Sequence, residues 1–322
     1  MTPPHRPLVS IAIPAYNESE NLDELFGRLR KVFAELENQY EFEVVICENG
    51  SRDDSMVRLE AIRQTDPRIR VVQLSRNFHM EGGIMAALSK VRGDVCVIMS
   101  ADLQDPPELI PSLLERWANG FDHVYTVITY RHGEGRFRRL AAQAFYWLIN
   151  RISETPVPRN ASDFRLVSRE MYLTFNSLPE RVRMVRALWG WIGFRSTSIS
   201  YERAPRVRGA SSFKVGVTTA FAIRGILSSS LSPLRIIPIL GLSLSLLAFF
   251  GVLGIAVRAM FFGVPFAGFG TITALMLLMF GLLFLLLAIL AEYLAMIFLE
   301  TRGRPMFVER EISTSSRVEN SS

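Results

Sequence analysis

Cysteine is scarce in this chain, with two residues in 322. Cys47 and Cys96 each lie inside a short apolar run, and neither has the neighbours or the spacing of a metal ligand. A cysteine-based metal site is therefore excluded. We predict two buried free thiols in a reducing compartment.

Charge is missing from two long stretches near the carboxyl terminus. No charged residue lies between Arg235 and Arg258, and none lies between Arg258 and Glu292. Each gap holds about 20 or more mainly apolar residues, the number needed to cross a hydrocarbon core of about 30 Å. We predict two transmembrane helices, at 236–257 and 271–297; the alternative is two long buried helices of a soluble core.

Basic residues are rare in the turn between these stretches. Arg258 alone lies near that turn, whereas five arginines flank the outer ends of the pair: Arg224, Arg235, Arg302, Arg304 and Arg310. By the positive-inside rule we predict a multi-pass protein of the inner membrane, with both termini cytoplasmic. We expect no signal peptide, because a strand-like run follows the first residues at once.

Nucleic-acid motifs are absent, and the basic residues are not interleaved with aromatic ones. No nucleic acid is therefore expected as a partner. The net charge of +5 instead suits phosphates or acidic lipid headgroups.

Short apolar runs alternate with helical patterns in the first 130 residues. Strand-like runs cover 8–13, 42–47, 69–74, 94–99 and 123–128. Helical patterns cover 22–36, which is clearly amphipathic, and more weakly 53–64, 81–91 and 107–119. This alternation predicts an α/β fold with a mostly parallel sheet. Ligands bind such sheets at the carboxyl ends of the strands, so polar residues there are the candidates.

Oxygen donors follow the fourth predicted strand, in the sequence ADLQD. Carboxylate and amide oxygens suit Mg²⁺ or Mn²⁺, and Mg²⁺ is usually held by one or two carboxylates plus substrate phosphates. A cluster that caps the next helix is the alternative. We assign Asp102 and Gln104 to a metal, and Asp105, which precedes two prolines, to the helix cap.

Six motifs occur in a characteristic order and spacing: PAYNE, ENGSRD, LSRNF, ADLQDPPELI, SDFRL and RALWGWIGF. Over nearly its whole length the chain resembles the family 2 inverting glycosyltransferases, especially the polyprenyl-phosphate and dolichyl-phosphate hexose synthases. The resemblance implies a GT-A-like nucleotide-sugar domain followed by two transmembrane α-helices. It implies transfer of a sugar, with inversion, from a UDP- or GDP-linked donor to a polyprenyl phosphate lipid at the cytoplasmic membrane face. The product would be a polyprenyl-phosphate-linked monosaccharide for glycan or lipid decoration.

The resemblance also implies roles for single residues. The nucleotide sugar would meet Pro14, Tyr16, Glu18, Glu48, Ser100, Ala101, Asp102 and Arg206. Asp102 and Gln104 would hold Mg²⁺ or Mn²⁺, and Asp102 and Asp163 would be catalytic, with Asp163 beside the sugar. The acceptor phosphate would be bound by Arg131, Arg138 and Arg139. A homo-oligomer, specifically a tetramer, is implied as well.

The motifs depart from the family pattern at three places. Glu48-Asn49 stands where two acids are usual, Ser100 stands where an aspartate is usual, and Ser212 stands at a usual lysine, with Lys214 nearby. Asn49 and Ser100 leave open a degenerate, non-catalytic membrane partner. A second alternative is an enzyme of the same fold with another acceptor, such as a diacylglycerol. A growing polysaccharide is disfavoured as acceptor, because the chain lacks a Gln-x-x-Arg-Trp sequence.

Together these patterns divide the chain into four predicted segments. They are a cytosolic glycosyltransferase domain at 1–210, an amphipathic juxtamembrane segment at 211–235, two transmembrane helices within 236–300, and a cytosolic tail at 301–322.

Overall fold

The computed structural model describes residues 6–130, 161–180, 185–203 and 268–310, together with single residues and short runs between 243 and 262. Its strands are β1 (Leu8–Ala15), β2 (Glu41–Glu48), β3 (Ile69–Gln73), β4 (Val95–Ile98), β5 (His123–Tyr130), β6 (Ala161–Ser168) and β7 (Ser196–Glu202). Its helices are α1 (Leu22–Leu36), α2 (Ser55–Thr65), α3 (His79–Leu88), the 3₁₀ turn η1 (Pro107–Leu109), α4 (Ile110–Ala118), α6 (Arg169–Ser177), α7 (Val185–Trp191) and α10 (Phe269–Thr301).

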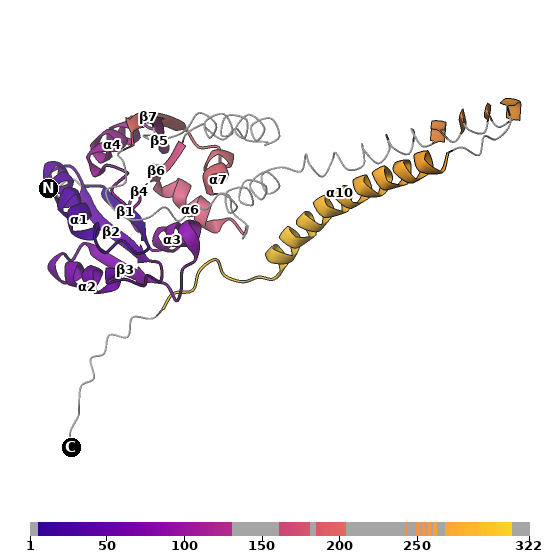
Figure 1. Cartoon of the computed structure of the whole chain (residues 1–322). Coiled ribbons are helices and arrows are strands. Elements are labelled where there is room, and N and C mark those ends of the chain that lie inside the picture. The colour runs from indigo at the N-terminus through magenta and orange to yellow at the C-terminus, as the bar shows by residue number, and fades with distance from the viewer. Residues whose placement is uncertain are drawn as a thin grey trace, which may run out of the picture.

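The seven strands form one sheet in the order β3-β2-β1-β4-β6-β5-β7 (Figure 1). Every pair is parallel except the two that involve β6, which runs antiparallel to β4 and to β5. The predicted α/β fold with a mostly parallel sheet is confirmed, and the five predicted strands are β1 to β5. The strands β6 and β7 were not predicted.

Helices cover both faces of the sheet. On one face the amphipathic α1 buries a stripe of apolar side chains, and α4 packs beside it through Ile110, Leu113 and Leu114. On the other face α3, α6 and α7 share a second apolar cluster, in which Phe175 and Trp189 stack with their ring centroids 3.8 Å apart. Because the sheet is covered on both sides, a polar ligand meets it at the ends of the strands.

The two cysteines are buried and unpaired, as predicted. Cys47 lies on β2 and Cys96 on β4, and both belong to the cluster that faces α3. Burial raises the pKa of both thiols well above the ordinary value, so neither is a reactive thiolate.

Helix α10 has the length and composition of a membrane span. Its stretch Leu278–Thr301 is 24 residues long, about 36 Å at 1.5 Å per residue, and only 6% of its most apolar window is buried. A buried helix of a soluble core does not fit such exposure, and Figure 1 shows α10 leading away from the sheet. Within the described ranges it is the one helix that meets this criterion.

The first predicted span, 236–257, lies mostly outside the described residues, and the few of its residues that are described are helical. A second transmembrane helix therefore stays a prediction. The predicted juxtamembrane segment, 211–235, also lies outside the described residues.

His123 is a buried titratable group at the start of β5. Its Nδ1 lies 3.1 Å from the Ser196 hydroxyl, and its Nε2 is buried without a hydrogen-bond partner. Burial, helped by the positive charge of Arg165, lowers the pKa of His123 to about 3.

We therefore expect the folded protein to lose stability as the pH falls below the ordinary histidine pKa of about 6.5. The unfolded chain takes up a proton there, whereas folded His123 stays neutral until about pH 3. The stability that neutral His123 confers is complete above about pH 6.5, and at pH 5 about 2 kcal/mol of it is lost. The measurement is the thermal unfolding midpoint in detergent at pH 7.5 and at pH 5. His123→Gln should shrink the difference between the two midpoints; an unchanged difference would contradict the assignment.

Candidate functional site

Strained backbone is concentrated at the carboxyl edge of the sheet. Three non-glycine residues of the described chain have positive φ: Asn17 at 55°, His79 at 62° and Leu103 at 59°. They follow β1, β3 and β4 respectively, so all three lie at the edge where parallel sheets bind ligands. Left-handed backbone costs about 1–2 kcal/mol for an ordinary residue, and such strain clusters at functional sites.

A cavity of about 300 Å³ opens at this edge. Its lining comes from the loops after β1, β2 and β3 and from the carboxyl-terminal segment: Tyr16, Glu48, Gly50, Ser51, Arg52, Gln73, Leu74, Ser75, Arg76, Asn77 and Arg310. Tyr16 and Glu48 are two of the residues predicted to meet the nucleotide. Glu48 is buried, and its carboxylate accepts a hydrogen bond from the Ser51 backbone N–H.

Gly50 allows two loops of this cavity to touch. Its φ is +68°, and a Cβ there would lie 2.5 Å from the carbonyl carbon of Arg76. Any side chain at position 50 would push the loop after β2 away from the loop after β3. The glycine of ENGSRD therefore shapes the cavity.

The Asn49 side chain, one of the departures from the family pattern, makes two hydrogen bonds that an ionised acid could not both make. Its Oδ1 accepts a hydrogen bond from the Phe78 backbone N–H at 2.9 Å, and its Nδ2 donates to the His79 carbonyl at 2.7 Å. An ionised acid could accept the first bond but could not donate the second. The amide thus holds the strained start of α3, and its presence does not require a degenerate site.

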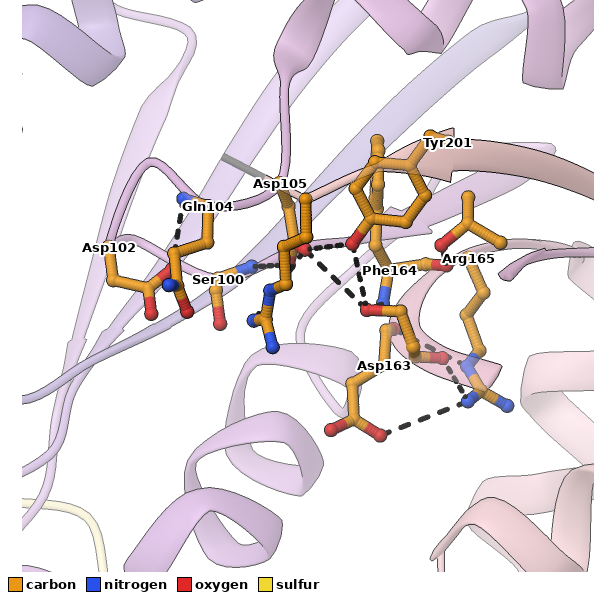
Figure 2. A network of polar contacts seen from close by, with 11 residues as sticks. Ser100, Asp102, Gln104, Asp105, Asp163, Phe164, Arg165 and Tyr201 are labelled. Atoms are coloured by element: carbon orange, nitrogen blue, oxygen red, sulfur yellow. Dashed lines mark hydrogen bonds and ion pairs between the residues drawn. The ribbon is translucent and has the colours of Figure 1, made fainter. Parts of the chain in front are cut away.

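The loop after β4 brings Asp102 and Gln104 together. The Gln104 backbone N–H donates to Asp102 Oδ1 at 3.2 Å, and Leu103 between them has a buried side chain and left-handed backbone. Figure 2 shows the two side chains next to each other, close to Ser100. The two predicted metal donors are therefore adjacent, and the predicted nucleotide-sugar residue Ala101 is buried.

Asp105 does not cap a helix, so that prediction is wrong. The turn η1 begins at Pro107 without a side-chain cap, and the Asp105 carboxylate, 1% exposed, points to other partners (Figure 2). It accepts hydrogen bonds from the Ser100 backbone N–H at 3.1 Å and from the Tyr201 hydroxyl at 2.8 Å. The Ser162 hydroxyl lies 3.5 Å away.

Arg203 forms the ion pair of this network, with its guanidinium 3.8 Å from Asp105. Burial nevertheless raises the pKa of Asp105, and the Arg203 charge opposes that rise only in part. Asp105 thus ties the loop after β4 to β6 and β7, the two strands that were not predicted.

Asp163 lies on β6 and is positioned by Arg165. The buried Arg165 guanidinium donates to the Ser162 carbonyl at 2.8 Å and to the Asp163 carbonyl at 3.3 Å. It also lies 3.8 Å from the Asp163 carboxylate, which is partly exposed. In the view of Figure 2, Asp102 and Asp163 lie on either side of the Asp105 network. The role of Arg165 was not predicted; its only sequence signal is its place in the SDFRL motif.

Two further predicted site residues lie on or just after β1. Pro14 lies on β1 next to β2, and the Glu18 carboxylate accepts a hydrogen bond from the Asn21 side chain at 2.6 Å, at the start of α1. The remaining predicted residues lie outside the described part of the chain: Arg131, Arg138, Arg139, Arg206, Ser212 and Lys214.

Known proteins resemble this chain along most of its length. The sequence model of glycosyl transferase family 2 matches residues 10–174. An uncharacterized glycosyltransferase of Synechocystis sp. is 35% identical over 305 residues, which cover 94% of this chain and 95% of that protein. A prophage-derived bactoprenol glucosyl transferase of Shigella flexneri is 33% identical over 300 residues, 93% of this chain and 96% of that protein.

Among solved structures, a glucosyl-3-phosphoglycerate synthase from Mycobacterium tuberculosis, in complex with Mn²⁺, UDP and phosphoglyceric acid, matches with a TM-score of 0.49. It is 21% identical, and the match covers 69% of this chain and 78% of that chain.

Proposed function

The chain belongs to glycosyl transferase family 2, and we propose that it transfers a sugar from a nucleotide diphosphate to a polyprenyl phosphate at the cytoplasmic membrane face. One observation supports polyprenyl phosphate as the acceptor. The similarity to the bactoprenol glucosyl transferase of Shigella flexneri covers 93% of this chain, so it extends beyond the sheet domain into the apolar carboxyl-terminal region.

The cavity at the sheet edge supports a nucleotide donor. Three arginines and one carboxylate, Glu48, are the charged residues of its lining, so its net charge favours an anionic ligand. Tyr16 and the buried Glu48 can meet the nucleoside, and the loop with Asp102 follows the neighbouring strand.

The residues at the end of β4 fit a divalent cation. In the described ranges no three His, Cys, Asp or Glu side chains are grouped as ligands, so the protein offers no complete cage there. Asp102 and Gln104 are two adjacent oxygen donors, which suits an Mg²⁺ or Mn²⁺ that takes its other ligands from phosphates and water. When bound, such a cation would neutralise negative charge on the departing diphosphate.

The proposed sugar transfer needs little general acid–base catalysis. A lipid phosphate monoester has a second pKa near 6, so at neutral pH it is mostly a dianion and already nucleophilic. One of its oxygens would form a bond to the anomeric carbon while the bond from that carbon to the diphosphate breaks. The nucleoside diphosphate leaves with the bonding electrons, and in-line attack inverts the anomeric centre.

The protein's task is then to bring two anions together. Asp163, held by Arg165, would orient the sugar, and Arg131, Arg138 and Arg139 would neutralise the acceptor phosphate. Helix α10, with the predicted helix before it, would keep the domain at the membrane surface, where the acceptor is found.

The function is tested by a transfer assay with the purified full-length protein in detergent. Radiolabelled UDP- and GDP-sugars are offered with undecaprenyl phosphate and Mg²⁺ or Mn²⁺. We expect labelled lipid from at least one donor, and none when the lipid phosphate is omitted. Absence of transfer from every donor would favour a non-catalytic partner, whereas transfer only to a diacylglycerol would favour the other acceptor.

Metal removal should stop the reaction. We expect an excess of EDTA to lower the initial rate at least about 100-fold, because the charge on the leaving diphosphate is no longer neutralised. Added Mg²⁺ or Mn²⁺ should restore the rate, while the thermal unfolding midpoint stays unchanged throughout. Turnover that persists in EDTA would rule out the metal at Asp102 and Gln104.

A further inference from the structure

The chain returns to the sheet after the apolar helix α10. The helix ends at Thr301, and Gly303, with a φ of +69°, redirects the backbone. Residues 302–310, which we call the return segment, then run back to the end of β3 (Figure 1). The strand β3 is an edge of the sheet, so its outer side is open to pairing.

Main-chain hydrogen bonds attach the return segment to the chain at the end of β3. The Ser75 N–H donates to the Val308 carbonyl at 2.9 Å, and the Arg310 N–H donates to the Gln73 carbonyl at 2.8 Å. The pairing is antiparallel. The return segment therefore covers the edge of the sheet where β3 ends and the loop that lines the cavity begins.

Side chains hold the return segment as well. Met306 and Phe307 are partly buried against the apolar cluster of α3, and Glu309 forms an ion pair with Lys90 at 2.8 Å. The segment is thus docked by backbone, apolar and charged contacts together. Such a combination fixes the position of the residue that follows, Arg310.

Arg310 lines the same cavity as Tyr16 and Glu48. Its guanidinium has no ion-pair partner among the described residues, and the same holds for Arg52, which also lines the cavity. Glu48 is the one carboxylate in the lining and already accepts a hydrogen bond from Ser51. Among the described residues the positive charge of Arg310 and Arg52 has no ion-pair partner, which suits a ligand with phosphate groups.

We propose that Arg310 is a donor-binding residue, supplied to the nucleotide cavity by the return segment, and that it binds the nucleoside diphosphate part of the donor. The proposal rests on the proposed function, because it takes the cavity to be the donor site. The cavity is complete only while the return segment, which follows the end of α10, stays docked at the end of β3.

The test is nucleotide binding to the full-length protein in detergent, measured by isothermal titration calorimetry with UDP and with GDP. For the nucleotide that the wild type binds, we expect Arg310→Ala to raise Kd about tenfold, the effect of losing a hydrogen bond to a charged group. The donor KM should rise by a similar factor, and Arg310→Lys should recover part of the loss. The matched control is Arg302→Ala, because Arg302 belongs to the same segment but lies over the Phe298 ring; its Kd should stay within about twofold.

A second variant tests the docking itself. Glu309→Lys places like charges at the Lys90 contact and should loosen the segment, so its Kd should also rise. Unchanged Kd in Arg310→Ala, with a wild type that binds, would overturn the proposal and leave the proposed function intact. If the wild type binds neither nucleotide, the proposed function fails and this proposal fails with it. Uridine and guanosine serve as further ligands: an equal loss for them places the guanidinium on the base or ribose, and a loss confined to the diphosphates places it on phosphate.

Discussion

Asp102→Asn should lower the rate of sugar transfer at least about 100-fold without unfolding the protein. Asparagine keeps the shape of the side chain and an oxygen that can accept the Gln104 N–H, so the loop after β4 should keep its conformation. What it lacks is the negative charge that attracts a divalent cation. The measurement is the initial rate at saturating donor, with the thermal unfolding midpoint as a check on folding.

Two comparisons make this result specific to the metal. The concentration of Mn²⁺ that gives half the maximal rate should rise in Asp102→Asn. The control is Asp23→Asn, the same chemical change at an exposed carboxylate of α1 that pairs with Arg58 at 2.9 Å. Its activity should match that of the wild type, because exposed ion pairs contribute little. If Asp102→Asn keeps more than about a tenth of the wild-type rate, Asp102 is not the ligand we propose.

The first half of the fold could be predicted because its signals are local. The strands β1 to β4 are short apolar runs, and α1 repeats its apolar residues every three and four positions. Such patterns depend on neighbours in the sequence and on one buried face. The parallel arrangement then follows from the helices that alternate with the strands, and it places the candidate site at one edge.

The strands β6 and β7 carry no such signal. The sequence of β6, ASDFRLVS, includes Asp163 and the buried Arg165, so it has the composition of a polar loop. Arg165 can be buried because carbonyl oxygens and the Asp163 carboxylate surround it. The strand β7 pairs with one neighbour at the other edge of the sheet and is mostly exposed. Its short run of serine, threonine and isoleucine is too weakly apolar to predict a strand.

Contacts between distant parts of the chain explain the other differences. Asp105 precedes two prolines, which locally favours a helix cap, but its partner Tyr201 is 96 residues away. The return segment is likewise read from the sequence as a tail, and its pairing with Leu74 depends on the path of the chain through α10. In both cases a contact with a residue far away in the sequence outweighs the structure that the neighbouring residues favour.

Asp105→Ala should lower the free energy of unfolding by about 3 kcal/mol, the second large effect we expect. It leaves the Ser100 N–H and the Tyr201 hydroxyl without their acceptor in a buried place, and each unsatisfied group costs about 1–3 kcal/mol. The thermal unfolding midpoint in detergent should fall by about 6 °C or more. Asp105→Asn keeps an acceptor oxygen and should lose less; a midpoint for Asp105→Ala equal to that of the wild type would contradict the role of the network.

The same variants separate a structural from a catalytic role. Tyr201→Phe removes one donor and should cost about 1 kcal/mol, and in the double variant with Asp105→Ala the two effects should fall short of their sum by about 0.5 kcal/mol or more. Asp105 accepts a hydrogen bond from the Ser100 backbone, and its charge also interacts with that of Asp102. Its loss should therefore weaken Mn²⁺ binding, through movement of the loop after β4 and through the change of charge near Asp102. Asp105→Asn keeps one side-chain oxygen that can accept a hydrogen bond in this network. It should therefore recover part of both the stability and the Mn²⁺ affinity.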